Sequence, residues 1–210
     1  MYVHHRKLGS SQENKPVWTN AVIFRDEYYK DKISAFSAGF RPINNNTVEL
    51  VEAENNVIDG ARWSRGFTRG KHVVEFIYPV HLRKSGARVG LGTRDTILGG
   101  KDKSVIVGGY KSLAVDLVNR KTICNNKVLK RFPQGKVLPD WFFMYFDLDE
   151  GIVQFGSDME FYGTAFTGIT NTEPVYPIVT GTLQGAIIGI VYRGQGKEIV
   201  GPLRKQRTLK

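Results

Sequence analysis

The sequence predicts an all-β protein, built as an antiparallel β-sandwich of two sheets with one short helix near the N-terminus. Three observations lead to this fold class. From about Thr47 onward, short runs are rich in β-branched and aromatic residues, and many alternate apolar and polar positions. Glycine, asparagine, aspartate and proline interrupt these runs at the spacing expected of a sandwich. A chain of 210 residues with 41% hydrophobic residues has room for one sizeable core, which favours a single domain.

The N-terminal quarter differs from the rest of the chain. Over residues 25–40, Tyr29, Ile33, Phe36 and Phe40 recur at helical spacing and form one apolar stripe. This pattern predicts a short helix packed on the sandwich, because a membrane-surface helix needs a longer apolar face with basic flanks. The asparagine-rich run at 43–46 then predicts a turn, because asparagine tolerates left-handed backbone conformations.

Nine runs are predicted to be strands, because they are too short and too rich in β-branched residues for helices. In chain order they are 47–53, 72–80, 87–93, 112–118, 122–126, 141–149, 151–156, 175–182 and 186–194. The clearest hairpin joins the sixth and seventh runs, where Gly151 can adopt the positive φ that a tight loop requires.

The net charge of +10 permits an acidic protein, nucleic acid or acidic lipid as a partner, because net charge governs association rather than fold. No run approaches the roughly 20 apolar residues of a membrane helix, and the first residues lack the apolar run of a signal peptide. Cys124 is the single cysteine, so no internal disulfide can form and a reducing compartment fits. The predicted location is the cytoplasm.

No catalytic pattern emerges from the sequence. The motif G-x-S-x-G is missing, and the runs GLGTRD and GFTRGKH lack residues that dinucleotide and phosphate loops need. The four histidines do not have the spacing of a zinc site. We therefore expect no enzyme, no cofactor and no metal, and we expect the loops of a rigid β-scaffold to bind a partner.

Five runs taken together resemble a SPRY domain in their order and spacing. They are DGARWSRGFTRGKHVVEFIYP at 59–79, ARVGLGT at 87–93, DLDEGIVQF at 147–155, YGTAFTGI at 162–169 and VYPIVTGTLQGAIIGIVYRG at 175–194. The resemblance is greatest to the SPRY domain and SOCS box proteins, the group that includes GUSTAVUS. It implies a bent, concanavalin-like sandwich. The expected division is a flexible segment at 1–20, the SPRY domain at 21–193 and a basic tail at 194–210.

The resemblance implies a protein–protein interaction domain that binds a short extended peptide, typically Asp-Ile-Asn-Asn-Asn-like, in a shallow pocket between loops. The positions that match the family's pocket are Val51, Ala53, Asn55, Arg83, Ser85, Asp102, Val105, Gly108, Gly109, Leu183 and Gln184. In this chain Glu52 and Glu54 lie where an acidic peptide would meet like charge. We therefore expect a different ligand, and not an Asp-Ile-Asn-Asn-Asn motif.

In this family the SOCS box recruits elongins and a cullin, so that the bound protein is ubiquitinated. Residues 194–210 lack the amphipathic helical pattern that docks an elongin. Two alternatives stay open: a SOCS box follows the sequence given, or the domain is a binding module without a ligase arm. Elongin and cullin are implied partners only in the first case.

Four basic residues, Arg62, Arg65, Arg69 and Lys71, precede the strand at 72–80. They are interpreted as largely solvated charges on a loop and strand start, with the nearby glycines serving backbone geometry. The alternative is that they bind nucleic acid or an anionic surface together with the basic tail. A third alternative is carbohydrate binding, which is supported only by analogy with other proteins of similar fold.

Overall fold

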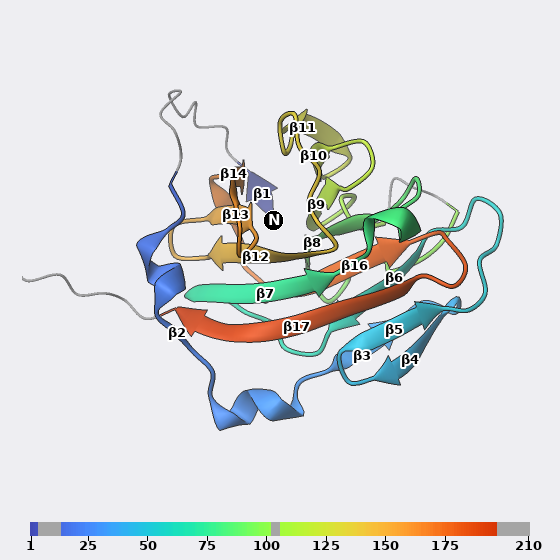
Figure 1. Cartoon of the computed structure of the whole chain (residues 1–210), viewed down its shortest axis with the longest axis horizontal. Coiled ribbons are helices and arrows are strands. Elements are labelled where there is room, and N and C mark those ends of the chain that lie inside the picture. The colour runs from blue at the N-terminus through green and yellow to red at the C-terminus, as the bar shows by residue number, and fades with distance from the viewer. Residues whose placement is uncertain (4–13, 102–105, 197–210) are drawn as a thin grey trace, which may run out of the picture.

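The computed structural model describes residues 1–3, 14–101 and 106–196, which fold into two packed antiparallel sheets (Figure 1). In the first sheet the strand order is β11 (Lys127–Arg131), β10 (Lys121–Cys124), β9 (Ser112–Asp116), β8 (Arg88–Gly92), β16 (Tyr176–Gly181), β6 (Asp59–Trp63) and β3 (Ile33–Phe36). The all-β, two-sheet antiparallel sandwich predicted from the sequence is confirmed.

The second sheet has eight strands. Their order is β14 (Phe161–Phe166), β13 (Ile152–Gly156), β12 (Trp141–Asp147), β7 (Lys71–Ile77), β17 (Ile187–Gly196), β5 (Thr47–Leu50) and β4 (Phe40–Asn44), and β2 (Val22–Ile23) pairs with the end of β17. A separate pair joins β1 (Tyr2–Val3) to β15 (Ile169–Thr170). Three short 3-10 helices complete the described part of the chain: η1 (Val17–Asn20), η2 (Asp26–Lys30) and η3 (Val80–Leu82).

The core lies between the two sheets and is rich in aromatic side chains. Phe76, Phe142 and Phe155 come from three neighbouring strands of the second sheet and are fully buried. Their rings follow one another, with centroids 5.8 Å apart for Phe76 and Phe142 and 6.2 Å apart for Phe142 and Phe155. Val89 and Leu91 of β8 belong to the same buried cluster. This core fixes both sheets and therefore the positions of the loops at their ends.

Each of the nine predicted runs contains a strand, and the hairpin between β12 and β13 has Gly151 at φ 66°. Pattern reasoning missed several other strands. Edge strand β11 has mostly exposed, charged residues, and β6 carries a glycine and an arginine, so neither shows a continuous apolar pattern. Their strand state comes from pairing with β10 and with β16.

The predicted helix over residues 25–40 is wrong. Within this segment Asp26–Lys30 form one 3-10 turn, Ile33–Phe36 form β3 and Phe40 begins β4. Ile33 and Phe40 are buried, but they lie on strands of different sheets joined by a turn, so their spacing arises from a chain reversal. Pairing with β6 satisfies the backbone groups of β3 that a helix would have satisfied internally.

The expected division of the chain at residues 20 and 193 stays a prediction. Within residues 1–20, β1 pairs with β15, and the ring of Trp18 lies edge-on to Tyr145 with centroids 6.3 Å apart. At the other boundary, β17 continues to Gly196. Residues 197–210 of the expected basic tail lie outside the described residues.

Candidate functional site

Three loops from both sheets meet at one end of the sandwich, at the right in Figure 1. The Gly185 amide donates a hydrogen bond of 2.7 Å to the Leu50 carbonyl, which ties the β16–β17 loop to the end of β5. The Thr182 hydroxyl donates a bond of 2.9 Å to the Ser85 carbonyl, which ties the same loop to the segment before β8. Residues 51–57, 84–85 and 183–185 together are called the loop surface below.

Asp59 anchors the base of the loop surface. Its carboxylate is buried and accepts hydrogen bonds from the Ser37 hydroxyl at 2.6 Å and from the Gly39 amide at 3.1 Å. The Gly39 carbonyl in turn accepts bonds from the amides of Val51, at 2.9 Å, and Glu52, at 3.3 Å. Asp59 therefore positions the start of the β5–β6 loop through Gly39.

Replacing Asp59 by alanine is expected to lower the free energy of unfolding by about 2 kcal/mol, because the half-buried Ser37 hydroxyl and the buried Gly39 amide lose a charged acceptor. Urea unfolding measures this loss, and amide hydrogen exchange should quicken at residues 51–52. Asp158→Ala removes an exposed carboxylate and should change the unfolding free energy by less than about 0.5 kcal/mol. Equal effects of the two substitutions would contradict the anchoring role.

The structure brings six of the predicted site residues to the loop surface. Asn55, Ser85 and Gln184 are exposed, whereas Val51 and Ala53 are half-buried. Leu183 is also half-buried and packs against the core. Whether these residues bind a partner stays a prediction.

The other predicted residues are placed differently. Gly108 and Gly109 are buried against the core, and their amides bond internally to the Ser112 hydroxyl and the Ile106 carbonyl. Asp102 and Val105 lie outside the described residues. These four positions therefore contribute no described, accessible side chain to the loop surface.

Arg83 is buried, and its guanidinium group is used within the fold. It donates hydrogen bonds to the carbonyls of Tyr78, Leu138 and Pro139, and it lies 5.5 Å from the ring centroid of Phe142. Burial lowers the pKa of Arg83 to about 10, so the group stays charged at neutral pH. These contacts leave the side chain 9% exposed, which favours a structural role over contact with a partner.

The charged residues of the loop surface are Glu52, Glu54 and Lys84, which are all exposed, so acidic groups outnumber basic ones. Arg41 forms an ion pair with Glu52 at 3.4 Å, but both side chains are about 70% exposed, so water and salt screen the pair. The surface therefore keeps an acidic side, as the sequence predicted.

The interpretation of Arg62, Arg65, Arg69 and Lys71 as largely solvated charges is wrong for three of the four. Arg62 donates hydrogen bonds to the carbonyls of Thr93 and Arg94, which hold it against the β8–β9 loop. Arg65 pairs with Asp31, and this hydrogen bond raises its pKa. Lys71 pairs with Asp147 at 3.3 Å and is 18% exposed. The three side chains are held by carboxylates and carbonyls from distant segments of the chain. The residues around Arg62, Arg65 and Lys71 carry no pattern from which these partners could be predicted.

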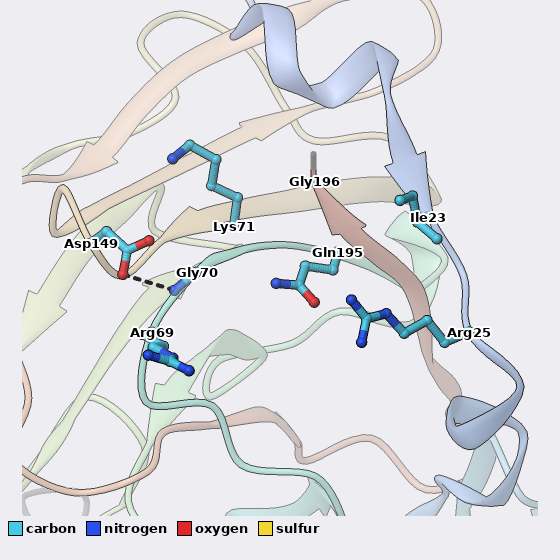
Figure 2. Close-up of a pocket in the computed structure, with 8 residues that line it drawn as sticks. All are labelled: Ile23, Arg25, Arg69, Gly70, Lys71, Asp149, Gln195 and Gly196. Carbon is cyan, nitrogen blue, oxygen red and sulfur yellow. Dashed lines mark hydrogen bonds between the residues drawn. The ribbon is translucent and has the colours of Figure 1, made fainter. Parts of the chain in front are cut away.

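A second feature is a hollow of about 500 Å³ beside the C-terminal end of β17 (Figure 2). It is called the Arg25–Arg69 hollow and is lined chiefly by Arg25, Arg69, Gly70, Lys71, Asp149 and Gln195. Sequence reasoning did not single out Arg25 or Gln195, because they come from segments far apart in the chain. In the part of the chain that the structure describes, no three histidine, cysteine or acidic residues form a metal cluster.

The described helices include none that is long and apolar enough to cross a membrane.

Comparison with curated proteins gives the following similarities. No family model matches the chain. The chain is 29% identical to SPRY domain-containing SOCS box protein 1 of Homo sapiens over 131 residues, which cover 58% of this chain and 48% of that protein. It is 30% identical to Protein gustavus of Drosophila melanogaster over 132 residues, which cover 58% and 47%. The chain thus matches about half the length of these relatives.

Comparison with solved structures shows the fold. The SPRY domain of human HERC1 matches with a TM-score of 0.56 and 14% identity, over 75% of this chain and 94% of that one. A human SPRY domain matches with a TM-score of 0.55 and 15% identity, over 75% and 96%. The chain therefore has the fold of a SPRY domain, and in sequence it is similar to the SPRY domain-containing SOCS box proteins and gustavus.

Proposed function

We propose that this SPRY domain is a non-enzymatic protein-interaction domain that binds a short extended segment of a partner protein through the loop surface. The observation that supports the proposal is the convergence of three loops from both sheets, held by one main-chain hydrogen bond and by one bond from a threonine hydroxyl to a main-chain carbonyl. Leu183 supplies an apolar floor, and Asn55, Ser85 and Gln184 supply exposed polar groups around it. An apolar floor with a few polar groups is typical of peptide sites on rigid scaffolds.

The charge of the loop surface favours a neutral or basic segment as the ligand. Glu52 and Glu54 are exposed beside Ala53 and Asn55. An aspartate in the ligand would meet like charge there, which lowers affinity and excludes wrong partners. The proposal therefore keeps the expectation that an Asp-Ile-Asn-Asn-Asn peptide binds weakly.

The similarity to SOCS box proteins extends the proposal to the ubiquitin pathway. In a longer protein with a SOCS box, this domain would act as the part of a ubiquitin ligase that recognises the substrate, and elongin and cullin would be the further partners. Without such a module, the domain would act as a binding adaptor. A cytoplasmic location stays a prediction under both versions.

The test is an affinity capture from cell lysate with the 210-residue chain and two charge-matched variants. Ala53→Arg with Gln184→Arg places two large cations on the loop surface. Val118→Arg with Val128→Arg adds the same charge at valines that are 43% and 57% exposed elsewhere. We expect a specific protein to be retained by the unchanged chain and the second variant, and lost with the first.

Loss of the captured protein with both variants, or with neither, would contradict the proposal. Capture that moderate salt removes equally from all three chains would favour nucleic acid or an anionic surface. The described structure gives that alternative less support than the sequence did, because Arg62, Arg65 and Lys71 already bind within the fold.

A further inference from the structure

The Arg25–Arg69 hollow is lined by residues from four segments that are distant in the sequence, and three of these segments supply side-chain hydrogen-bond donors. The segment after β2 supplies Arg25, and the loop before β7 and the first residue of that strand supply Arg69 and Lys71. The β12–β13 hairpin supplies Asp149 and the end of β17 supplies Gln195. Figure 2 shows the Arg25 side chain extending toward the Gln195 amide, whereas the Lys71 side chain points away from Arg25. Arg25 and Arg69 thus line the hollow on opposite sides of the Gln195 amide.

Arg25 and Arg69 have no partner among the described residues. Both side chains are exposed, and neither forms an ion pair or a side-chain hydrogen bond with this part of the chain. Lys71 differs, because its ammonium group is paired with Asp147. Cationic groups that the fold has not paired remain able to bind an external anion.

The acidic residue in the lining, Asp149, lies on the Arg69 side of the hollow, and among the described residues it forms no ion pair with Arg25 or Arg69 (Figure 2). Its carboxylate accepts a hydrogen bond of 3.0 Å from the Gly70 amide and lies on the other side of Gly70 from Arg25 (Figure 2). With Asp147 engaged by Lys71, the lining keeps an excess of positive charge. The hollow therefore favours an anionic occupant electrostatically.

Gln195 adds a neutral donor to the site. Its side-chain oxygen accepts a bond of 3.4 Å from the Tyr28 hydroxyl, so its amide nitrogen can donate to a ligand. This nitrogen lies 3.3 Å from where a Cβ on Gly70 would be, and Gly70 has φ +88°. Glycine at this position therefore keeps the space between Gln195 and the loop open.

We propose that the Arg25–Arg69 hollow is a second binding site, which takes the carboxylate side chains of an acidic peptide segment. Guanidinium groups bind carboxylates through two parallel hydrogen bonds, and arginine clusters are a recurrent way to bind acidic motifs. A hollow of about 500 Å³ holds more than one side chain, which fits a segment rather than a single small ion. The site does not depend on the proposed loop-surface function.

The lining argues against nucleic acid as the occupant. It contains no phenylalanine, tyrosine or tryptophan on which bases could stack.

The position of the hollow allows two partners to bind at once. The ten residues of β17 separate it from the loop surface, a distance of roughly 30 Å at about 3.3 Å per residue. The two surfaces differ in charge, because Glu52 and Glu54 border one and Arg25 and Arg69 border the other. One partner with a basic and an acidic segment could therefore engage both ends of the domain.

The test is a fluorescence-anisotropy titration of the 210-residue chain with a labelled peptide, Gly-Glu-Asp-Glu-Asp-Gly, and its neutral counterpart, Gly-Gln-Asn-Gln-Asn-Gly. Arg25→Gln with Arg69→Gln should weaken binding of the acidic peptide about tenfold, the loss expected for two exposed ion pairs. Arg94→Gln with Arg131→Gln removes the same charge from exposed arginines elsewhere and should change the affinity by less than about twofold. All three chains keep residues 197–210, so binding to that segment affects them equally.

Amide chemical shifts in NMR spectra locate the peptide. We expect the largest changes at Lys71 and Gln195 when the acidic peptide binds. Equal losses in the two double variants, equal binding of the neutral peptide, or shifts confined to other residues would overturn the proposal. Full displacement by an equal concentration of inorganic phosphate, or tighter binding of single-stranded RNA, would overturn the choice of an acidic peptide.

Discussion

Replacing Arg83 by methionine is expected to lower the free energy of unfolding by about 4 kcal/mol. The buried guanidinium group donates hydrogen bonds to the carbonyls of Tyr78, Leu138 and Pro139, and methionine leaves all three without that donor. The change also removes the contact of the cation with Phe142. Urea unfolding followed by tryptophan fluorescence measures the loss.

Two further variants make this prediction specific. Lys84→Met changes the neighbouring exposed side chain and should alter the unfolding free energy by less than about 0.5 kcal/mol. Arg83→Lys keeps the charge but lacks the planar fork, so it should recover only part of the stability. An Arg83→Met chain that is as stable as the unchanged protein but captures no partner would show instead that Arg83 contacts the partner.

Acidification is expected to destabilise the fold through His72. Its imidazole donates from Nε2 to the Arg69 carbonyl at 2.8 Å, because a carbonyl can only accept, and Nδ1 accepts from the Tyr192 hydroxyl at 2.9 Å. Burial beside Phe67 disfavours the charged form and lowers the pKa of His72 from 6.5 to about 4. The neutral ring is therefore the form that the folded protein accommodates.

The sign of the pH effect follows from the two pKa values. Between pH 6.5 and 4 the unfolded chain binds a proton at His72 that the folded chain does not. Protonation of His72 therefore does not lower the free energy of unfolding above about pH 6.5. As pH falls from 7.5 to 4.5, it lowers the free energy of unfolding by about 2.5 kcal/mol.

A His72→Gln variant isolates this contribution from the carboxylates that titrate in the same range. Glutamine can donate to the Arg69 carbonyl and accept from the Tyr192 hydroxyl, but it does not titrate. Urea unfolding at pH 7.5 and 4.5 should show a loss about 2.5 kcal/mol smaller in the variant. The same pH dependence in both chains would contradict a buried, neutral His72.

The strands of the sandwich could be predicted where one strand face is buried and the other is not. Runs such as 141–149 carry this alternation in their own residues, and turn residues mark their ends. Strands β3 and β4 could not be predicted in this way. The burial of Ile33 and Phe40 depends on β6 and on the second sheet, so the local spacing was compatible with a helix.

The candidate site was partly predictable for a similar reason. Family resemblance marked loop positions such as Ala53 and Gln184, which the structure places at one end of the sandwich. It also marked Arg83 and Gly108, whose burial depends on residues far along the chain. In the Arg25–Arg69 hollow, Arg69 and Lys71 belong to the basic run that the sequence marked. Arg25 and Gln195 had no signal, because they meet through the pairing of β2 with β17.

The central claim is that the loop surface binds the partner, and hydrogen–deuterium exchange of the 210-residue chain with and without its captured partner tests it most directly. We expect the partner to slow exchange at residues 51–57, 84–85 and 183–185. Exchange at residues 69–71 of the Arg25–Arg69 hollow should slow only when the partner also carries an acidic segment. Slowed exchange at other surfaces, with the loop surface unchanged, would contradict the claim.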